Sequence, residues 1–228
     1  MSTLYAIPTP LGGKATDALP VSALEIVRSL RDFAVEEAKS ARAFLKDVGM
    51  PCPIQELRID VLQGDMRHLV KTMRAGTPVG LLSEAGCPAI ADPGAMLVEA
   101  AQREGIRVLP MIGPSSIVLA LMASGLEGQR FCFCGYLPRE SEDRKKKIRA
   151  MEGRSRRERE TQIFIETPYR NDAMLAALVE TCAPDTRLCL ASDLTLGTES
   201  ISTRAMDEWR SSGYAVGKRP TVFLLLSR

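Results

Sequence analysis

The sequence predicts a two-domain α/β protein, and three observations carry that prediction. Short apolar runs such as "TLYAIP" and "VGLLS" alternate with segments of helical periodicity, as in parallel sheets covered by helices on both faces. The alternation restarts after residue 113, with hairpin-like spacing in "LCLASDLTLGTESIS". The length of 228 residues suffices for two such units. We expect an N-terminal domain at 1–113 with a mostly parallel sheet and a C-terminal domain at 114–228 with a mixed sheet.

In the first half, helices are marked by apolar residues three or four apart, as at Leu24, Val27 and Leu30, and by closing glycines such as Gly49 and Gly76. Strands are expected at residues 3–8, 32–37, 79–83 and 106–110, and helices at 21–30, 38–49, 66–76 and from about 95. The connection at 83–94 is rich in glycine, proline and acidic residues and is longer than a strand-to-helix turn requires. We expect a ligand to lie against it.

In the second half, strands are expected at residues 130–137, 161–166, 186–192, 197–202 and 221–227, and helices at 117–124, 171–182 and near Trp209. Residues 108–126 form the most apolar region, but Gly113, Pro114, Ser115 and Ser116 interrupt it. That interruption favours a buried strand, a turn and a buried helix over a membrane span.

Residues 139–159 carry ten Lys or Arg against five Asp or Glu and no aromatic residue. Such a segment offers contacts to the phosphates of RNA but no stacking platform for bases. A mobile, solvated helix and loop would have the same composition. The sequence leaves both interpretations open.

Composition excludes several kinds of chemistry. The net charge of +2 does not by itself indicate a nucleic-acid binder. Six cysteines without regular spacing and a single histidine, His68, supply neither a zinc site nor a serine hydrolase triad. No Walker sequence or GxGxxG motif is present. The first residues lack a basic segment followed by an apolar one, so we expect free thiols, no metal, no membrane segment and a cytoplasmic protein.

The ends of the expected strands carry small and polar residues. In open parallel sheets, ligands bind beyond the carboxyl ends of the strands, and glycine and proline let the backbone approach a flat ligand closely. Each loop alone could be simple turn punctuation. Several such loops on one edge indicate a binding site. They are residues 8–13, Glu36 and Glu37, residues 84–86, 113–116, 166–170 and 192–195.

Six of these stretches also resemble a known family. "YAIPTPLGG", "GLLSEAGCPAIADPG", "IGPSS", "FCGYLP", "FIETPYR" and "ASDLT" occur in the order typical of the tetrapyrrole methylase superfamily, the class III S-adenosylmethionine-dependent methyltransferases. Within it, the sequence is most similar to bacterial small-subunit ribosomal RNA methyltransferase I, which methylates a ribose 2′-hydroxyl. The resemblance covers the chain from about Thr3 to Leu226. It implies two α/β domains with S-adenosylmethionine in the cleft between them, and a homodimer.

The resemblance also assigns residues, as expectations. Cofactor contacts fall on positions in the strand-end loops of both domains. They are Pro10, Ser83, Glu84, Ala85, Ile90, Asp92, Ser115, Ser116, Thr167, Leu190, Asp193 and Leu194. Candidates for positioning the acceptor or taking its proton are Glu36, Glu37, Arg42 and Tyr169.

The sequence departs from the family where an acceptor would be chosen. The family's Glu-Asp-Thr-Arg is Glu36, Glu37, Ala38 and Lys39 here, and "QELRID" at 55–60 replaces a histidine-containing segment. Family members usually carry a helical extension beyond the matching region, so we expect a short divergent paralogue. RNA, and rRNA in particular, is the expected acceptor. A small acceptor such as a tetrapyrrole, or a cofactor-binding module without catalysis, stays open.

Overall fold

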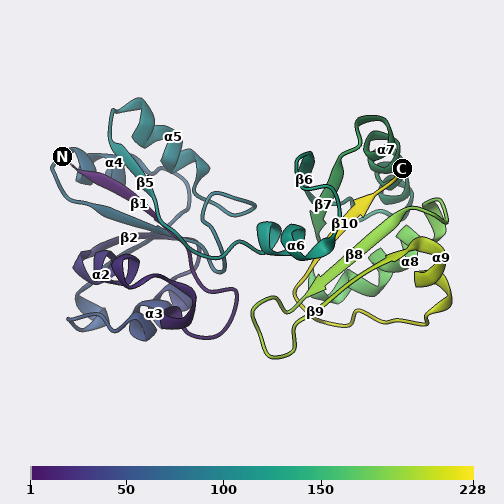
Figure 1. Ribbon diagram of the computed structural model, residues 1–228. Helices are drawn as coiled ribbons and strands as arrows, with labels where there is room; N and C mark the ends of the chain where they lie inside the picture. Colours follow the sequence, from purple (N-terminus) through teal and green to yellow (C-terminus); the bar gives the residue numbers. More distant parts are fainter. Residues whose placement is uncertain (1) are drawn as a thin grey trace. The chain divides into compact units, whose positions relative to one another are not determined.

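The computed structural model describes residues 2–228. They form two compact units, one ending at Ser115 and one from Ser116 to Arg228, shown in Figure 1. Each unit has one five-stranded sheet. The predicted fold class is confirmed, because every strand pair of the first sheet is parallel, whereas the second sheet mixes parallel and antiparallel pairs.

The first unit alternates strands and helices, as predicted. Its strands are β1 (Thr3–Ile7), β2 (Asp32–Val35), β3 (Arg58–Val61), β4 (Val79–Leu82) and β5 (Arg107–Pro110). Its helices are α1 (Ala15–Ala18), α2 (Val21–Ser29), α3 (Ala38–Val48), the 3₁₀ turn η1 (Ile54–Glu56), α4 (Arg67–Arg74) and α5 (Ala95–Arg103). The strand order β3-β2-β4-β1-β5 puts β1, β2 and β4 in the centre.

Helices cover both faces of this sheet (Figure 1). Side chains alternate across a strand, and the central strands therefore supply two cores. Phe33 faces α2 and α3, where Val27 and Leu45 are fully buried. Leu81 faces α4 and α5, beside Met73. Burial on both faces explains why these strands are continuous apolar runs in the sequence.

Strand β3 overlaps the segment at 55–60 that departs from the family, and no strand was expected there. It is an edge strand, paired only with β2. Its Arg58 Nη1 lies 3.3 Å from Asp32 Oδ1, and none of its residues is fully buried: the two end residues are exposed and the two middle ones are half-buried. The segment at 55–60 thus builds the sheet edge.

The second unit contains five further strands. They are β6 (Phe131–Tyr136), β7 (Thr161–Ile165), β8 (Arg187–Ser192), β9 (Ser200–Ala205) and β10 (Thr221–Leu226), in the order β6-β7-β10-β8-β9. Its helices are α6 (Ser116–Ser124), α7 (Ser141–Glu158), the 3₁₀ turn η2 (Pro168–Arg170), α8 (Asn171–Thr181) and α9 (Met206–Ser211).

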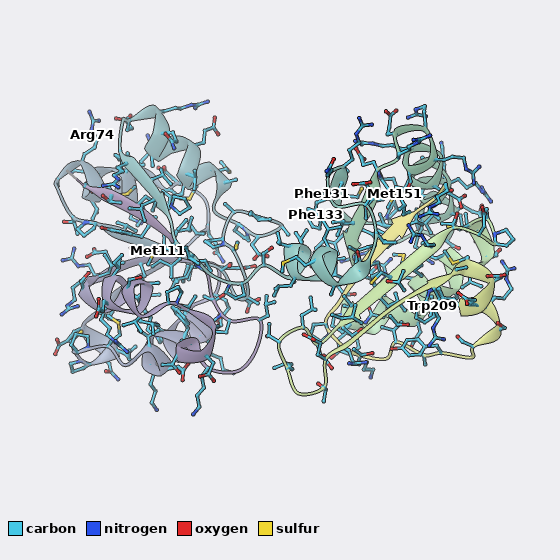
Figure 2. The ribbon with its side chains drawn as sticks, viewed as in Figure 1. Arg74, Met111, Phe131, Phe133, Met151 and Trp209 are labelled. Atoms are coloured by element: carbon cyan, nitrogen blue, oxygen red, sulfur yellow. The ribbon has the colours of Figure 1, made fainter. Side chains whose placement is uncertain are left out.

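One face of the second sheet packs against α7, α8 and α9. Met151 and Trp209, labelled in Figure 2, belong to this core. Phe164 and Phe223 stack there with ring centroids 5.3 Å apart, and the Trp209 indole N–H donates to Leu188 O at 2.9 Å. Helix α6 lies against the strands β8, β9 and β10.

Most of the basic segment is one continuous helix, α7. Ile148, Met151 and Ser155 recur at helical spacing on its buried face, and Lys145 Nζ pairs with Glu180 of α8 at 2.7 Å. The helix and loop considered as the solvated alternative is therefore a helix throughout residues 141–158. The exposed face of α7 keeps the excess of basic side chains.

All six cysteines are free thiols; Cys182 and Cys189 are buried and the other four are half-buried. Residues 2–228 contain no group of His, Cys, Asp and Glu side chains that could hold a metal ion. No helix in that range is both long and apolar enough to cross a bilayer.

Candidate functional site

Two loops at the carboxyl edge of the first sheet are tied together by their backbones. Thr9, after β1, and Gly86, after β4, exchange N–H···O bonds of 2.9 and 3.0 Å. The Thr9 hydroxyl also donates to Ser83 O at 3.3 Å. Since β1 and β4 are neighbouring strands, these bonds hold the two loops side by side at the carboxyl edge of the sheet.

Glu36, which follows β2, is bonded to the end of β4 and to the loop after it. Its N–H donates to Leu82 O at 3.2 Å, and its carboxylate Oε2 accepts the Glu84 N–H at 3.0 Å. Three predicted site residues, Glu36, Ser83 and Glu84, are therefore brought together. Glu84 itself is exposed and Ser83 is buried.

Asp92 completes a group of carboxylates that we call the acidic cluster: Glu36, Glu84 and Asp92. Burial raises the pKa of Asp92 to about 6, with a further rise from the charges of Glu36 and Glu84, while a hydrogen bond with Ser83 acts in the opposite direction. No lysine or arginine forms an ion pair with these three carboxylates in the described range 2–228. The folded protein thus holds negative charge close together without a positive partner.

The loop that carries Asp92 has an unusual backbone. Ala89 and Ala91 adopt left-handed conformations with φ of 65° and 66°, and Gly94 has φ of 125°. A left-handed residue with a side chain costs roughly 1–2 kcal/mol, and such strain concentrates where ligands bind. Ile90, between the two alanines, is 51% exposed although it is strongly apolar. The loop therefore holds an apolar side chain out of the core.

A fourth loop, after β5, packs closely on the first. A Cβ added to Gly113 would lie 2.4 Å from the Cβ of Pro8, so only glycine fits. The Cys87 thiol donates to Pro114 O at 3.4 Å, and its pKa is raised by burial and by Asp92. The half-buried residues Pro10 and Ser115 lie in these same loops.

Two other predicted residues stand at the start of α3. Glu37 is its N-cap, and its carboxylate accepts the Ser40 N–H at 2.6 Å. Backbone hydrogen bonds from Lys39 and Ser40 hold the pKa of Glu37 below its usual range. Arg42 is exposed on α3. Glu37 therefore has a structural task at the helix terminus, while Arg42 is free to meet a ligand.

In the second unit, residues 166–170 form a tight turn after β7. Glu166 is buried, accepts the Thr167 N–H at 2.7 Å and lies 3.1 Å from Arg170. Tyr169 projects outward with 81% exposure, and Lys218 Nζ lies 5.1 Å from the centre of its ring. Ser116 begins α6 in this same unit.

The loop after β8 holds Asp193 in a left-handed conformation with φ of 52°. Its carboxylate binds Arg219 at 2.7 Å and the Thr198 hydroxyl at 3.0 Å, and the bond from Arg219 lowers its pKa. Leu194 and Leu190 are buried, and Leu190 belongs to the core under α8. Leu190 is paired to strands on both sides, so we leave it out of the proposed site.

The sequence placed Thr9, Ala89 and Ala91 within predicted site loops but did not single out the contact of Thr9 or the backbone conformation of the two alanines. A threonine at a strand end gives a weak signal, because its hydroxyl contacts a loop that is 74 residues away. An alanine gives no sequence signal for a left-handed backbone conformation, because glycine and asparagine are the residues that usually adopt it.

No family model matches the sequence, but known proteins are similar to it. It is 33% identical to "Ribosomal RNA small subunit methyltransferase I" of Escherichia coli O157:H7 over 198 residues, which cover 87% of this chain and 67% of that protein. The protein of the same name from Pseudomonas aeruginosa is 31% identical, with 90% and 71% covered.

Solved structures share the fold at low sequence identity. Diphthine synthase matches with a TM-score of 0.64 at 16% identity, covering 100% of this chain and 90% of that one. Uroporphyrin-III-C-methyltransferase from Thermus thermophilus matches with a TM-score of 0.58 at 16% identity, covering 99% and 92%. Sequence and fold agree, and the resemblance seen in the motifs is confirmed. The chain thus shares the fold of uroporphyrin-III-C-methyltransferase and diphthine synthase, and by sequence it belongs to the ribosomal RNA small subunit methyltransferase I family.

Proposed function

We propose that S-adenosylmethionine is the methyl donor and binds at the carboxyl edge of the first sheet. The observation that carries this proposal is the acidic cluster of Glu36, Glu84 and Asp92, which has no basic partner within residues 2–228. At neutral pH the donor has a net positive charge, and the sulfonium charge is lost on methyl transfer. An edge of this kind therefore suits the donor better than a phosphate-containing nucleotide.

The backbone of the site also fits such a ligand. The left-handed residues Ala89 and Ala91, and the close approach at Gly113, expose backbone groups rather than bulky side chains. Pro10, Ser83, Ala85, Ile90 and Ser115 are the proposed neighbours of the donor in this unit. The resemblance adds Ser116, Thr167, Asp193 and Leu194 of the second unit.

We infer that the acceptor is RNA, with a ribose 2′-hydroxyl of ribosomal RNA as the first candidate. Support comes from the names of the relatives, which act on small-subunit rRNA, and from the basic surface of α7. Methyl transfer to a hydroxyl requires the oxygen in line with the donor's S–CH3 bond, and alignment alone supplies much of the rate. The S–CH3 bond breaks, an O–CH3 bond forms, and the hydroxyl proton must leave.

Glu36 is the proposed acceptor of that proton. Its Oε2 is held by the Glu84 N–H, so the side chain is oriented, and no hydrogen bond from residues 2–228 occupies Oε1. Glu37 is less suited because its carboxylate caps α3. Arg42 is proposed to bind an acceptor phosphate, and Tyr169 offers an exposed ring on which a base can stack.

The test is transfer of a radiolabelled methyl group from S-adenosylmethionine. Small ribosomal subunits and their naked RNA, from a strain lacking this protein, serve as acceptors. Labelled RNA that yields a 2′-O-methylated nucleoside on digestion supports the proposal. Calorimetry with S-adenosylmethionine and S-adenosylhomocysteine runs in parallel, and absence of binding to either compound would end the donor proposal.

The alternative acceptor is a small molecule such as a tetrapyrrole. Its support is the fold shared with uroporphyrin-III-C-methyltransferase. Donor binding with no label in RNA, but with label in uroporphyrinogen III, would favour it. Donor binding with no transfer to either acceptor would favour a binding module without catalysis.

We also propose a homodimer in the cytoplasm, as the resemblance implies. The second unit exposes apolar side chains that a partner copy could cover. They are Val118 and Met122 of α6, 49% and 75% exposed, and Phe131 of the edge strand β6, 46% exposed and labelled in Figure 2. Sedimentation of the wild type and of Met122→Glu tests this, since a monomeric wild type would exclude it.

A further inference from the structure

The second unit contains a hollow lined by four arginines. It has a volume of about 610 Å³ and is bounded by residues 125–127, the end of α7, the start of β8 and the end of β10. Arg156 lies in α7 and Arg159 caps its end, whereas Arg187 begins β8 and Arg228 follows β10. Glu127 is the one acidic residue in the lining. We call this feature the arginine hollow.

The four guanidinium groups lack acidic partners. None forms an ion pair with a carboxylate among residues 2–228, and Glu127 Oε1 instead accepts the Gln129 N–H at 2.8 Å. Arg156 Nη2 donates only to a neutral group, the Ser227 hydroxyl, at 3.1 Å. The hollow thus gathers four arginine side chains that form no ion pair among residues 2–228.

Arg187 gives the clearest sign of a missing ligand. Its Nε is buried and has no hydrogen-bond partner, and a buried unsatisfied charged donor is costly to keep. Burial and the neighbouring Arg228 both lower its pKa. A bound anion would offset both effects on the pKa.

Arg159 points to the same conclusion through its backbone. It ends α7 in a left-handed conformation with φ of 53°, a position where glycine is strongly preferred. Arginines near a helix C-terminus can also favour the helix dipole. The dipole gives no reason for Arg187, which begins β8, or for Arg228, which follows β10, so a ligand explains the set better.

Strand directions place the hollow apart from the predicted site loops of this unit. Leu226 pairs with Arg187 at one end of β8 and β10, and Thr221 pairs with Ser192 at the other. The loop at 193–195 therefore starts about 17 Å from the hollow, the length of such a strand. Nothing bound in the hollow could be the reacting group at that loop.

We propose that the arginine hollow binds phosphate groups of the RNA backbone, several nucleotides from the methylated position. The inference rests on the proposed function for its choice of RNA. Arginine forks match phosphate oxygens in bidentate geometry. The volume exceeds what one free phosphate needs, and the basic face of α7 continues from the hollow, as a polymer of phosphates requires.

The test compares two variants with the same change of charge. The hollow variant carries Arg156→Gln and Arg187→Gln. The control carries Lys71→Gln and Arg107→Gln, two exposed residues of the first unit, away from α7 and from the lining. The hollow variant should fold well, because Arg187 Nε loses no partner and Arg156 loses only a bond to a hydroxyl.

Binding of small-subunit rRNA fragments is measured against salt concentration, and methyl transfer is measured on the same RNA. The hollow variant should bind roughly tenfold more weakly, with a salt slope smaller by about 0.7–0.9 for each phosphate that the protein no longer neutralises. The KM for RNA should rise while kcat and donor affinity stay near wild type. RNA too short to reach from the acceptor to the hollow should not distinguish the variants.

Inorganic phosphate gives a direct readout. At constant ionic strength it should raise the melting temperature of the wild type and the control, but not of the hollow variant. Equal losses of RNA binding in both variants, or no loss in either, would overturn the inference while leaving RNA methylation intact. A wild type that binds RNA through the hollow without methylating it would refute the proposed function alone. A wild type that binds no RNA would overturn the inference, even if acidic peptides bound there.

Discussion

The two units carry opposite charges at comparable places in similar architectures. The first gathers Glu36, Glu84 and Asp92 at one edge of its sheet, whereas the second gathers four arginines at an edge of its own. In a parallel sheet, all carboxyl ends meet at one edge, and the loops there collect the cluster. In the mixed sheet, β10 runs against β8, so its end meets the start of β8. Both edges hold like charges that repel, and we propose that a ligand of opposite charge relieves the repulsion at each. The net charge of +2 conceals both clusters.

The largest expected effect concerns the acidic edge. Glu36→Gln should lower methyl transfer by about a hundredfold or more, because it removes the proposed proton acceptor. The amide oxygen can still accept the Glu84 N–H, so the loop should keep its shape. Single-turnover transfer from bound donor measures this effect.

Glu37→Gln is the matched control, since its amide oxygen can still cap α3. It should retain most of the activity. Loss of activity in Glu37→Gln with full activity in Glu36→Gln would reverse the assignment of these two neighbours.

The next largest expected effect concerns the packing of Gly113 against Pro8 at the same edge of the first sheet. Gly113→Ala should destabilise the first unit by about 1–3 kcal/mol, because the new Cβ would overlap Pro8. Gly128→Ala in the second unit meets nothing within 4 Å and should change stability by less than about 0.5 kcal/mol. Thermal unfolding of both variants measures the difference. Equal melting temperatures would show that the loops at 8–13 and 113–115 can move apart freely.

The acidic edge should also make stability depend on pH. Asp92 has a pKa of about 6 in the folded protein and about 3.9 when unfolded. Between these values the folded state keeps a proton that the unfolded state has lost, so the free energy of unfolding falls as pH rises from about 4 to 6. Because Asp92 is only half-buried, solvent screening reduces the effect to the order of 1 kcal/mol.

Asp92→Asn should remove that slope and stabilise the protein above pH 6. Denaturant unfolding at several pH values measures it. Glu36→Gln should move the same transition to lower pH, because it removes a neighbouring negative charge. Donor affinity in the wild type should increase as pH rises through 6, and a flat profile would argue against Asp92 as a neighbour of the donor.

The smallest expected effect concerns the stability of variants at Arg159, and it tests whether this residue of the arginine hollow contributes to folding. Arg159→Gly should stabilise the second unit by up to about 1 kcal/mol, because it removes a left-handed residue with a side chain. Arg157→Gly, two residues earlier within α7, should instead cost about 1 kcal/mol. Urea unfolding gives both signs. If Arg159→Gly were destabilising, the arginine side chain would contribute to folding, and the argument for a ligand would weaken.

Much of the fold could be predicted because burial on both faces leaves a clear mark. Strands β1, β4 and β10 are continuous apolar runs, and α3 ends at the predicted Gly49. The edge strand β3 left no such mark, since one neighbour and much solvent surround it. The helix α7 was obscured for a similar reason, because few of its residues are buried.

The two candidate sites differ in the same way, because one leaves a clear mark in the sequence and the other does not. The residues Ser83–Asp92 are contiguous in the sequence, so they form a motif that the sequence alone makes visible. The arginine hollow combines Arg156, Arg187 and Arg228 from three separate parts of the chain, and no spacing rule connects them. Glu37 shows a further limit, since a carboxylate beside Glu36 looks equally catalytic until its bond to Ser40 is seen.

The buried thiols of the second unit provide a built-in reporter of its opening. Burial raises the pKa of Cys182 to about 12 and also raises that of Cys189, so neither thiol should react with an alkylating reagent in the folded state. The first unit has only half-buried thiols, Cys52 and Cys87. Mass spectrometry after a short alkylation pulse would therefore follow the unfolding of the second unit in the intact, unmutated chain. The effects of phosphate and of S-adenosylmethionine on the two units could then be told apart in a single sample.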